Sequence, residues 1–243
     1  MRNVWTIARR EYNLYFMTPI AYAVSFMLLL ILGVLFYLNL QYAMSQLYAP
    51  GIQIVLGPLV FLLLFATPAI TMRLLADEHR MGTIELLLTS PVRDWELVVG
   101  KWLGGWLFLL TIVAITWIYP LILNQLVDPG IDQGPLITGY LGIVLISAAL
   151  VAIGVAVSSL FNNQIAVYFV NLGLLLVLWM LMASPQSVGG GSNELLNYLN
   201  FRNHFYDTFY AGIIDVQDVV YYLSITALSL FLGSVSVETR RWR

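Results

Sequence analysis

Long apolar stretches, separated by short polar ones, dominate the sequence. A helix needs about 20 apolar residues, each rising about 1.5 Å, to cross the hydrocarbon core of a bilayer. By this criterion we expect six membrane-spanning helices, at residues 20–40, 52–76, 97–123, 136–161, 165–183 and 219–237. The pattern therefore predicts an all-α, polytopic membrane protein that forms a single domain over residues 1–243.

The composition agrees with a membrane protein. The chain is 60% hydrophobic and 10% charged, whereas soluble domains are about 45–50% apolar and about 25% charged. It has no cysteine, which excludes disulfides, thiolate chemistry and Cys-based metal sites. The formal net charge of −2 gives no indication of a nucleic-acid partner, and we expect none.

Basic residues gather on one side of the expected spans. That side carries ten of the eleven Lys and Arg residues, namely Arg2, Arg9, Arg10, Arg73, Arg80, Arg93, Lys101, Arg240, Arg241 and Arg243. Only Arg202 falls on the other side, together with six acids. Because cytoplasmic loops are rich in Lys and Arg, we expect both termini to be cytoplasmic, which agrees with an even number of spans.

Residues 2–17 precede the first span and predict an amphipathic helix. Its polar face carries Arg2, Thr6, Arg9, Arg10 and Asn13, and its apolar face carries Val4, Ile7, Ala8, Tyr12, Tyr15 and Phe16. A helix of this kind lies in the membrane interface, with its cations toward anionic lipid headgroups. Two roles stay open: a simple anchor, or an elbow helix that takes part in coupling.

The connection between the second and third spans contains a short apolar helix, expected at residues 83–89. Gly82 interrupts the chain before it, Thr83 is a suitable N-cap, and Glu85 lies in the first turn, where the helix dipole favours an acid. The large aliphatic side chains of this helix must be covered, either by the protein's own bundle or by a groove on another protein. A loop that lies on the membrane without a partner is the alternative. At the end of the connection, we expect Asp94 to cap the third span.

This connection resembles the coupling-helix loop of ABC-2 type permeases. The family pattern E-x-x-x-G-T-x-E-L-L-L-(T/S)-x-P is matched here by Glu78, Gly82, Thr83, Glu85, Leu86, Leu87, Leu88, Thr89 and Pro91. Two further stretches resemble the gliding-motility-type branch of the family. They are Arg9-Arg10-Glu11-Tyr12 with Thr18-Pro19-Ile20, and His204-Phe205 with Phe209-Tyr210-Ala211-Gly212.

The resemblance implies the permease subunit of an ABC transporter, an exporter in the cytoplasmic (inner) membrane of a bacterium or archaeon. Two permeases, identical or related, would pair above two ATP-binding cassette ATPase subunits. ATP and Mg would bind on those partners, so this chain would hold no cofactor and would not be an enzyme. The residues implied to contact the ATPase are Glu78, Gly82, Thr83, Glu85, Leu86, Leu87 and Leu88.

Other chemistry finds little support in the residues. The one Gly-Lys pair, Gly100-Lys101, is followed by Trp102, so a P-loop is absent and ATP hydrolysis must come from another chain. No charged residue or His falls in the middle of an expected span. This argues against an ion-coupled carrier and against an intramembrane enzyme, and we expect no catalytic or metal-ligating residue.

Several features inside the spans predict how they pack. Pro68, beside Thr67, lies within the second span and predicts a kink that could act as a lever for the following connection. Gly100 and Gly104 form a pair of small residues at four-residue spacing, which allows close helix packing. This pair is interpreted as a bundle contact, with a dimer seam as the alternative.

Residues 184–217 are long for an extracytoplasmic connection and predict a loop with short helices. This segment is rich in large apolar side chains, namely Leu195, Leu196, Tyr198, Leu199, Phe201, Phe205, Phe209 and Tyr210. They would either cap a substrate route or bind an envelope or auxiliary partner, or else seat the last span as an aromatic belt.

One alternative function keeps the same complex. The chain would then be a mechanical transmitter that passes ATP-driven motion to an envelope protein without moving a solute. The sequence does not separate this from export.

Overall fold

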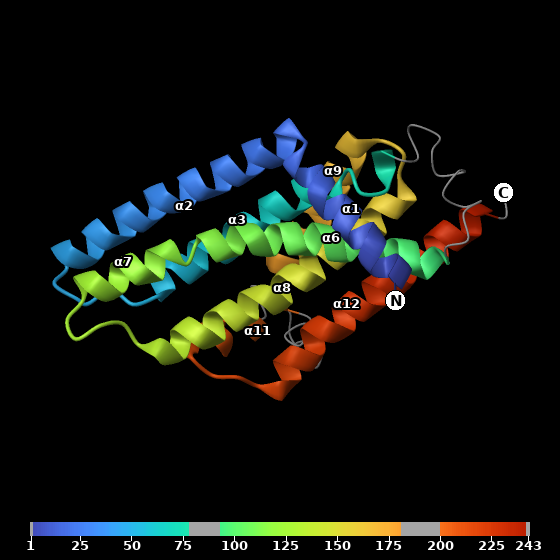
Figure 1. Ribbon diagram of the computed structural model, residues 1–243. Coiled ribbons are helices and arrows are strands. Elements are labelled where there is room, and N and C mark those ends of the chain that lie inside the picture. Colours follow the sequence, from blue (N-terminus) through green and yellow to red (C-terminus); the bar gives the residue numbers. More distant parts are fainter. Residues whose placement is uncertain (1, 78–92, 181–199, 242–243) are drawn as a thin grey trace.

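The computed structural model describes residues 2–77, 93–180 and 200–241, and these residues form a bundle of helices without strands (Figure 1). Five helical segments are long and apolar enough to cross a membrane. They are α2 (Pro19–Ser45), α3 (Gln53–Thr71), α6 (Asp94–Ile115) continued by α7 (Ile118–Leu126), α8 (Gln133–Leu160) and α12 (Val216–Arg241). The other helices are α1 (Arg2–Phe16), α9 (Gln164–Met180), α11 (Asn203–Tyr206) and the 3-10 helix η2 (Phe209–Ala211).

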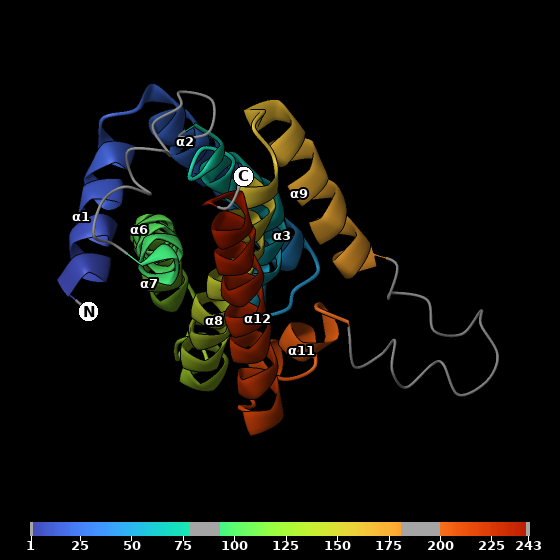
Figure 2. The same cartoon turned by 90° about the vertical axis from the view of Figure 1, so that its right-hand side faces the viewer.

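The centre of the bundle is α8. In its most apolar stretch 78% of the residues are buried, against 22% in α2 and 28% in α12. The outer helices accordingly expose large apolar side chains, such as Phe26 on α2 (68% exposed) and Phe231 on α12 (63%). Surfaces of this kind are unfavourable in water and suit a lipid environment, which agrees with a multi-pass membrane protein. Helices α1 and α9 lie on opposite outer sides of the bundle (Figure 2).

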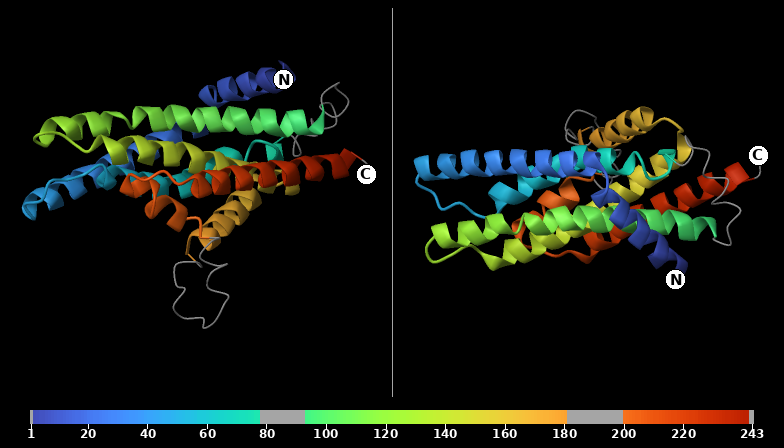
Figure 3. Two further views of the ribbon diagram at one scale, coloured as in Figure 1. Left: turned by 90° about the horizontal axis from the view of Figure 1, so that it is seen from below. Right: turned by 45° about the horizontal axis from the view of Figure 1, so that its top comes forward.

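The expected fifth span, at residues 165–183, corresponds to α9. Its 17 described residues reach only about 25 Å, less than the ~30 Å of a bilayer core, and the last residues of the expected span, 181–183, lie outside the described residues. The chain leaves α8 at the end of the bundle where both termini lie, and α9 runs back from there (Figures 1 and 3). The next described residues approach the opposite end, where Gly212 contacts Pro135 at the start of α8.

Two other expected spans are interrupted. The span expected at 52–76 ends as a helix at Thr71, and turns follow it. Pro68 lies inside this helix, which continues past it for one further turn. The span expected at 97–123 is broken at Thr116 and Trp117, between α6 and α7. The Thr116 hydroxyl donates a hydrogen bond to the Val113 carbonyl (2.7 Å) and lies within hydrogen-bond distance of the Tyr140 hydroxyl (3.1 Å).

The described part of the predicted extracytoplasmic segment is built into the bundle. Phe201, Phe205 and Phe209 are buried. The Thr138 hydroxyl of α8 donates to the Phe209 carbonyl (2.8 Å), and the Tyr222 hydroxyl of α12 donates to the Phe201 carbonyl (3.0 Å). Residues 200–212, hereafter the aromatic cap, therefore seat the last helix, which is one of the roles expected of this segment. Leu195, Leu196, Tyr198 and Leu199 lie outside the described residues.

A buried polar contact joins α3, α8 and α9. Asn171 Nδ2 of α9 donates to Thr71 Oγ1 of α3 (3.2 Å), and the Thr71 hydroxyl in turn donates to the Thr67 carbonyl (2.9 Å). Gly154 of α8 lies directly against this pair, since a Cβ on it would overlap the Thr71 side chain. The absence of a side chain at residue 154 thus lets three helices meet.

Substitution of Gly154 by Ala tests this contact. We expect Gly154→Ala to lower the free energy of unfolding by about 1–3 kcal/mol, because the added methyl group overpacks the junction. Gly173→Ala is the matched control, since nothing lies within 4 Å of a Cβ there; it should be neutral or raise stability by up to about 1 kcal/mol through helix propensity. Thermal unfolding in detergent measures both, and equal stabilities would contradict the assignment.

Candidate coupling site

All seven residues expected to contact an ATPase lie outside the described residues. They are Glu78, Gly82, Thr83, Glu85, Leu86, Leu87 and Leu88, within the segment 78–92 that also contains the predicted helix 83–89. The structure describes where this segment leaves the bundle and where it returns. We call residues 72–77 the departing stem and residues 93–96 the returning stem.

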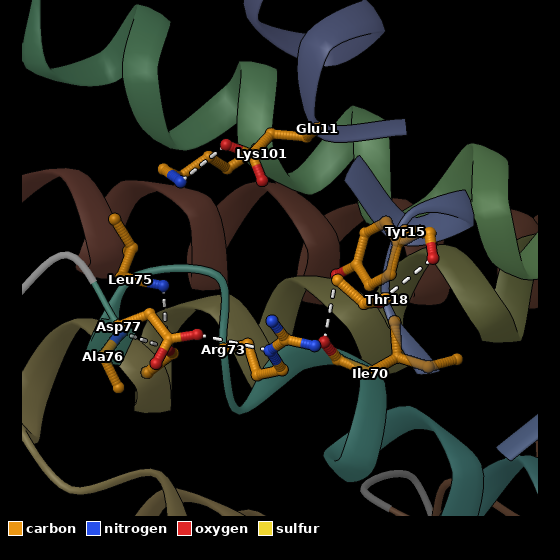
Figure 4. Close-up of polar contacts among 10 residues, drawn as sticks. Glu11, Tyr15, Thr18, Ile70, Arg73, Leu75, Ala76, Asp77 and Lys101 are labelled. Carbon is orange, nitrogen blue, oxygen red and sulfur yellow. Dashed lines mark hydrogen bonds and ion pairs between the residues drawn. The ribbon is translucent and has the colours of Figure 1, made fainter. Parts of the chain in front are cut away.

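A single hydroxyl holds the departing stem. Ser158 Oγ, near the end of α8, accepts hydrogen bonds from the backbone N–H groups of both Leu75 and Ala76, each at 3.1 Å (Figure 4). Leu75 and Ala76 are fully buried, so water cannot reach their N–H groups and take the place of the Ser158 oxygen as acceptor. A hydroxyl oxygen has two lone pairs and can accept both bonds. The stem is therefore fixed to α8 by its main chain.

An ion pair also lies on the departing stem. Arg73 Nε is 3.2 Å from Asp77 Oδ2, and the two side chains are 28% and 21% exposed. Partly exposed pairs at four-residue spacing contribute only about 0.3–0.5 kcal/mol. The buried hydrogen bonds to Ser158 are thus the main constraint on this stem.

Helix α1 reaches the base of the departing stem through Tyr15. Its hydroxyl donates to the Ile70 carbonyl in the last turn of α3 (2.9 Å), and its ring stacks on Phe108 of α6 at 4.6 Å between centroids. Burial, and then the negative charge of Glu11, raise the pKa of Tyr15 well above its ordinary value, although Arg73 opposes them. The hydroxyl therefore stays protonated, as a hydrogen-bond donor, throughout the physiological pH range.

Two glycines let α1 lie directly on α6. A Cβ on Gly100 would come within 2.8 Å of Ile7 Cβ, and one on Gly104 within 2.6 Å of Glu11 Cβ. The interpretation of this glycine pair as a bundle contact is confirmed, with α1 as the partner helix. Between the glycines, Lys101 Nζ lies 2.9 Å from Glu11 Oε1, and the Lys101 side chain is only 2% exposed.

The Lys101–Glu11 pair was not anticipated from the sequence. Lys101 was counted only as one of the basic residues on the cytoplasmic side. A signal was present, because Glu11 is the one acid within residues 2–17 and Lys101 is the one charge within residues 97–123. Two isolated opposite charges in otherwise apolar surroundings are expected to pair, since loss of one partner from a buried pair is strongly destabilising.

The returning stem is also tied to α1. Glu96 Oε2 accepts hydrogen bonds from the Arg93 backbone N–H (3.1 Å) and from Asn3 Nδ2 of α1 (3.2 Å). The expectation that Asp94 caps this helix was wrong by one residue: Arg93 occupies the N-cap position and Asp94 is the first helical residue. Glu96 decides this boundary, because its carboxylate at the third helical position captures the Arg93 N–H.

Helix α1 thus contacts both sides of the segment 78–92. Tyr15 near its end bonds the base of the departing stem, and Asn3 near its start bonds the returning stem. The burial of α1 follows the expected amphipathic pattern in part: Ala8 and Tyr15 are buried against the bundle, and the described polar-face residues are exposed. Phe16 departs from it and is 39% exposed.

Comparison with known families identifies the family of this chain. The profile described as "ABC-2 family transporter protein" matches residues 46–200, well over half of the chain. The chain belongs to the ABC-2 family of transporter proteins. It is therefore a multi-pass membrane protein of the permease type, a transport subunit without catalysis of its own, in a family that associates with an ABC ATPase subunit. No curated protein matches the chain. The matched range includes both stems, Ser158 and the segment between the stems, whereas α1 lies outside it.

Removal of the Ser158 hydroxyl tests how the departing stem is held. Ser158→Ala leaves two buried N–H groups without an acceptor, so we expect a loss of about 1–3 kcal/mol in unfolding free energy and faster amide hydrogen exchange at residues 75–77. Ser159→Ala is the matched control on the same helix, because the Ser159 hydroxyl donates back to the Ala156 carbonyl of α8 and not to the stem. If the two variants protect residues 75–77 equally, Ser158 does not hold the stem.

Proposed function

We propose that this chain is the permease subunit of an ABC-2 exporter in the inner membrane of a bacterium or archaeon, and that the segment 78–92 receives the ATPase. The observation that carries the proposal is that both stems of this segment are hydrogen-bonded to helices of the bundle. The departing stem is bonded to α8, the returning stem to α1, and α1 also to the base of the departing stem. A force on the segment would therefore act on three helices together.

The arrangement of the chain ends supports a cytoplasmic location for this segment. The N-terminus, the C-terminus and both stems lie at the same end of the bundle (Figures 1 and 3). The basic residues on these parts would face the cytoplasm under the positive-inside rule. In this topology α9, together with residues that follow Met180, makes the fifth of six crossings, because the chain must travel between the two ends of the bundle before α12 begins.

The assembly would contain four principal subunits. Two copies of this permease, or this chain and a related one, would stand above two ATPase subunits that bind ATP and Mg. The stretches near α1 and α11 that resemble the gliding-motility-type branch favour that branch within the ABC-2 family. Contacts with the ATPase would be made by the residues from Glu78 to Leu88 that match the family pattern.

Charge reversal in the segment tests the coupling role. We expect Glu85→Arg combined with Leu87→Asp to abolish co-purification of the ATPase subunit and its stimulation by the permease, because a buried aliphatic contact is replaced by a carboxylate. Glu194→Arg with Leu195→Asp is the control, since it makes the same changes in the segment proposed to be extracytoplasmic. An ATPase that still binds and responds normally to the first variant would refute the assignment.

Mechanical transmission to an envelope protein is the second candidate. One observation favours it: the far end of the bundle has a crevice of about 690 Å³ between the α2–α3 connection and the aromatic cap. Asn39, Gln53, Tyr206 and Tyr210 line it and present neutral polar groups. Such a surface suits an extracytoplasmic protein partner at the end of the bundle opposite the stems.

Reconstitution separates the two functions. For an exporter, the complex in liposomes should move a candidate solute in proportion to ATP hydrolysis. For a transmitter, hydrolysis should rise only when the envelope partner is added, with no solute movement. Permease-free liposomes that contain the ATPase alone provide the baseline. Solute movement without the partner would eliminate the transmitter.

A further inference from the structure

A hollow lies in the angle between α1 and α6. The two helices touch at Gly100 and Gly104 and then diverge, since α1 crosses the direction of α6 (Figure 1). On the side away from the stems, the angle between them forms an open hollow of about 580 Å³. We call this hollow the α1–α6 crook. Nothing derived above for the coupling site uses it.

The wall formed by α1 is cationic and polar. Arg9 lines it, together with Trp5, Tyr12 and Asn13. Arg9 is exposed, as is Arg10 next to it, and within the described part of the chain neither guanidinium has an ion-pair partner. Arg9 also lines a second, outer hollow on α1, whereas Arg10 lines that outer hollow and does not line the crook. The crook therefore has one guanidinium that is free to bind an anion.

The wall formed by α6 is apolar. Leu107, Leu110 and Ala114 line it at helical spacing. The one polar side chain among them, Thr111, is already bonded, to the Leu107 carbonyl (3.0 Å) and to the Tyr12 hydroxyl (3.1 Å). These residues follow Gly104 by three to ten positions, which places them about 5–15 Å farther along the bundle. The apolar wall thus extends away from the stems beyond Gly104, the point at which Ala8 and Glu11, on either side of Arg9, lie against α6.

We propose that the α1–α6 crook binds an anionic phospholipid, with its phosphate at Arg9 and an acyl chain along Leu107, Leu110 and Ala114. The two walls are placed as the two parts of a phospholipid are. The charged headgroup would lie at the membrane surface beside Arg9, and the acyl chain would lie deeper in the bilayer, along α6. A guanidinium suits a phosphate, and Trp is common at the level of lipid headgroups. A free phosphate ion would leave the apolar wall unused.

The bound lipid would support the coupling site. It would fill the open side of the α1–α6 contact and so hold α1 where Tyr15 and Asn3 reach the two stems. The inference rests on the membrane location that the proposed function gives to α1. It does not require the ATPase, so lipid binding is measured on the full permease chain alone, and its failure would leave the role of the segment 78–92 unaffected.

Native mass spectrometry of the full chain in detergent tests the proposal, with phosphatidylglycerol and phosphatidylcholine of identical acyl chains as probes. We expect one phosphatidylglycerol to be retained in preference. Arg9→Gln should lower its retention about fivefold or more, the effect of losing about 1 kcal/mol of charge attraction. Arg10→Gln is the matched control, because it removes the same charge from the same helix but outside the crook. It should change the retention of phosphatidylglycerol less than about twofold relative to the unchanged chain. Equal losses would show surface attraction only and would overturn the proposal.

A second pair of variants tests the apolar wall without a change of charge. Ala114→Trp should displace the lipid, whereas Ile115→Trp, on the adjacent and exposed position of α6 that does not line the crook, should not. Circular dichroism and gel filtration check folding, and Leu110→Phe replaces Ala114→Trp if that variant aggregates. Retention unchanged by either blocking variant, or competition by glycerol phosphate as effective as by the whole lipid, would show that no acyl chain is bound.

Discussion

A main chain that leaves helical geometry inside an apolar bundle must find new partners for its N–H groups, because neither lipid nor the core supplies them. This constraint governs the structure at the end of α3. Leu75 and Ala76 are fully buried just beyond the helix, and one hydroxyl, on Ser158 of α8, accepts from both. The direction in which the chain leaves the bundle is thus set by a contact between segments 83 residues apart.

The contact between α1 and α6 depends on a balance between desolvation and attraction in a buried ion pair. Burial of Lys101 and Glu11 costs desolvation, which their mutual attraction offsets only at close approach. Gly100 and Gly104 permit that approach, since a methyl group at either position would overlap α1. Because the two glycines flank the lysine, the ion pair and the close contact are satisfied in the same register. That register brings Asn3 and Tyr15 to the two stems.

Hydropathy was sufficient to locate α2, α8 and α12 within a few residues of their ends, because long apolar runs with polar flanks have few alternative placements. Hydropathy was insufficient where contacts between residues distant in sequence decide where a helix ends or how deeply a side chain is buried. In the sequence, Ser158 is one of three serines in the apolar stretch of α8, and nothing sets it apart. Pro68 predicted a kink in the second span, but not that α3 ends at Thr71. The cap at Arg93 instead of Asp94 depends on the side chain of Glu96, and the depth of Lys101 depends on a helix 90 residues away.

The two ends of α3 are held differently, and this bears on how a force at the stems would spread. At the end near the stems, the bonds from Tyr15 and to Ser158 are buried and measure 2.9–3.1 Å. At the far end, the hydroxyls of Tyr206 and Tyr210 reach the carbonyls of Gly57 and Gln53 at 3.4 Å each, close to the limit of a hydrogen bond. The aromatic cap itself is bonded more closely to α8 and α12 than to α3. If an ATPase moves the segment 78–92, as proposed, α3 should therefore move with α1 and α8 at the end near the stems and yield first against the aromatic cap.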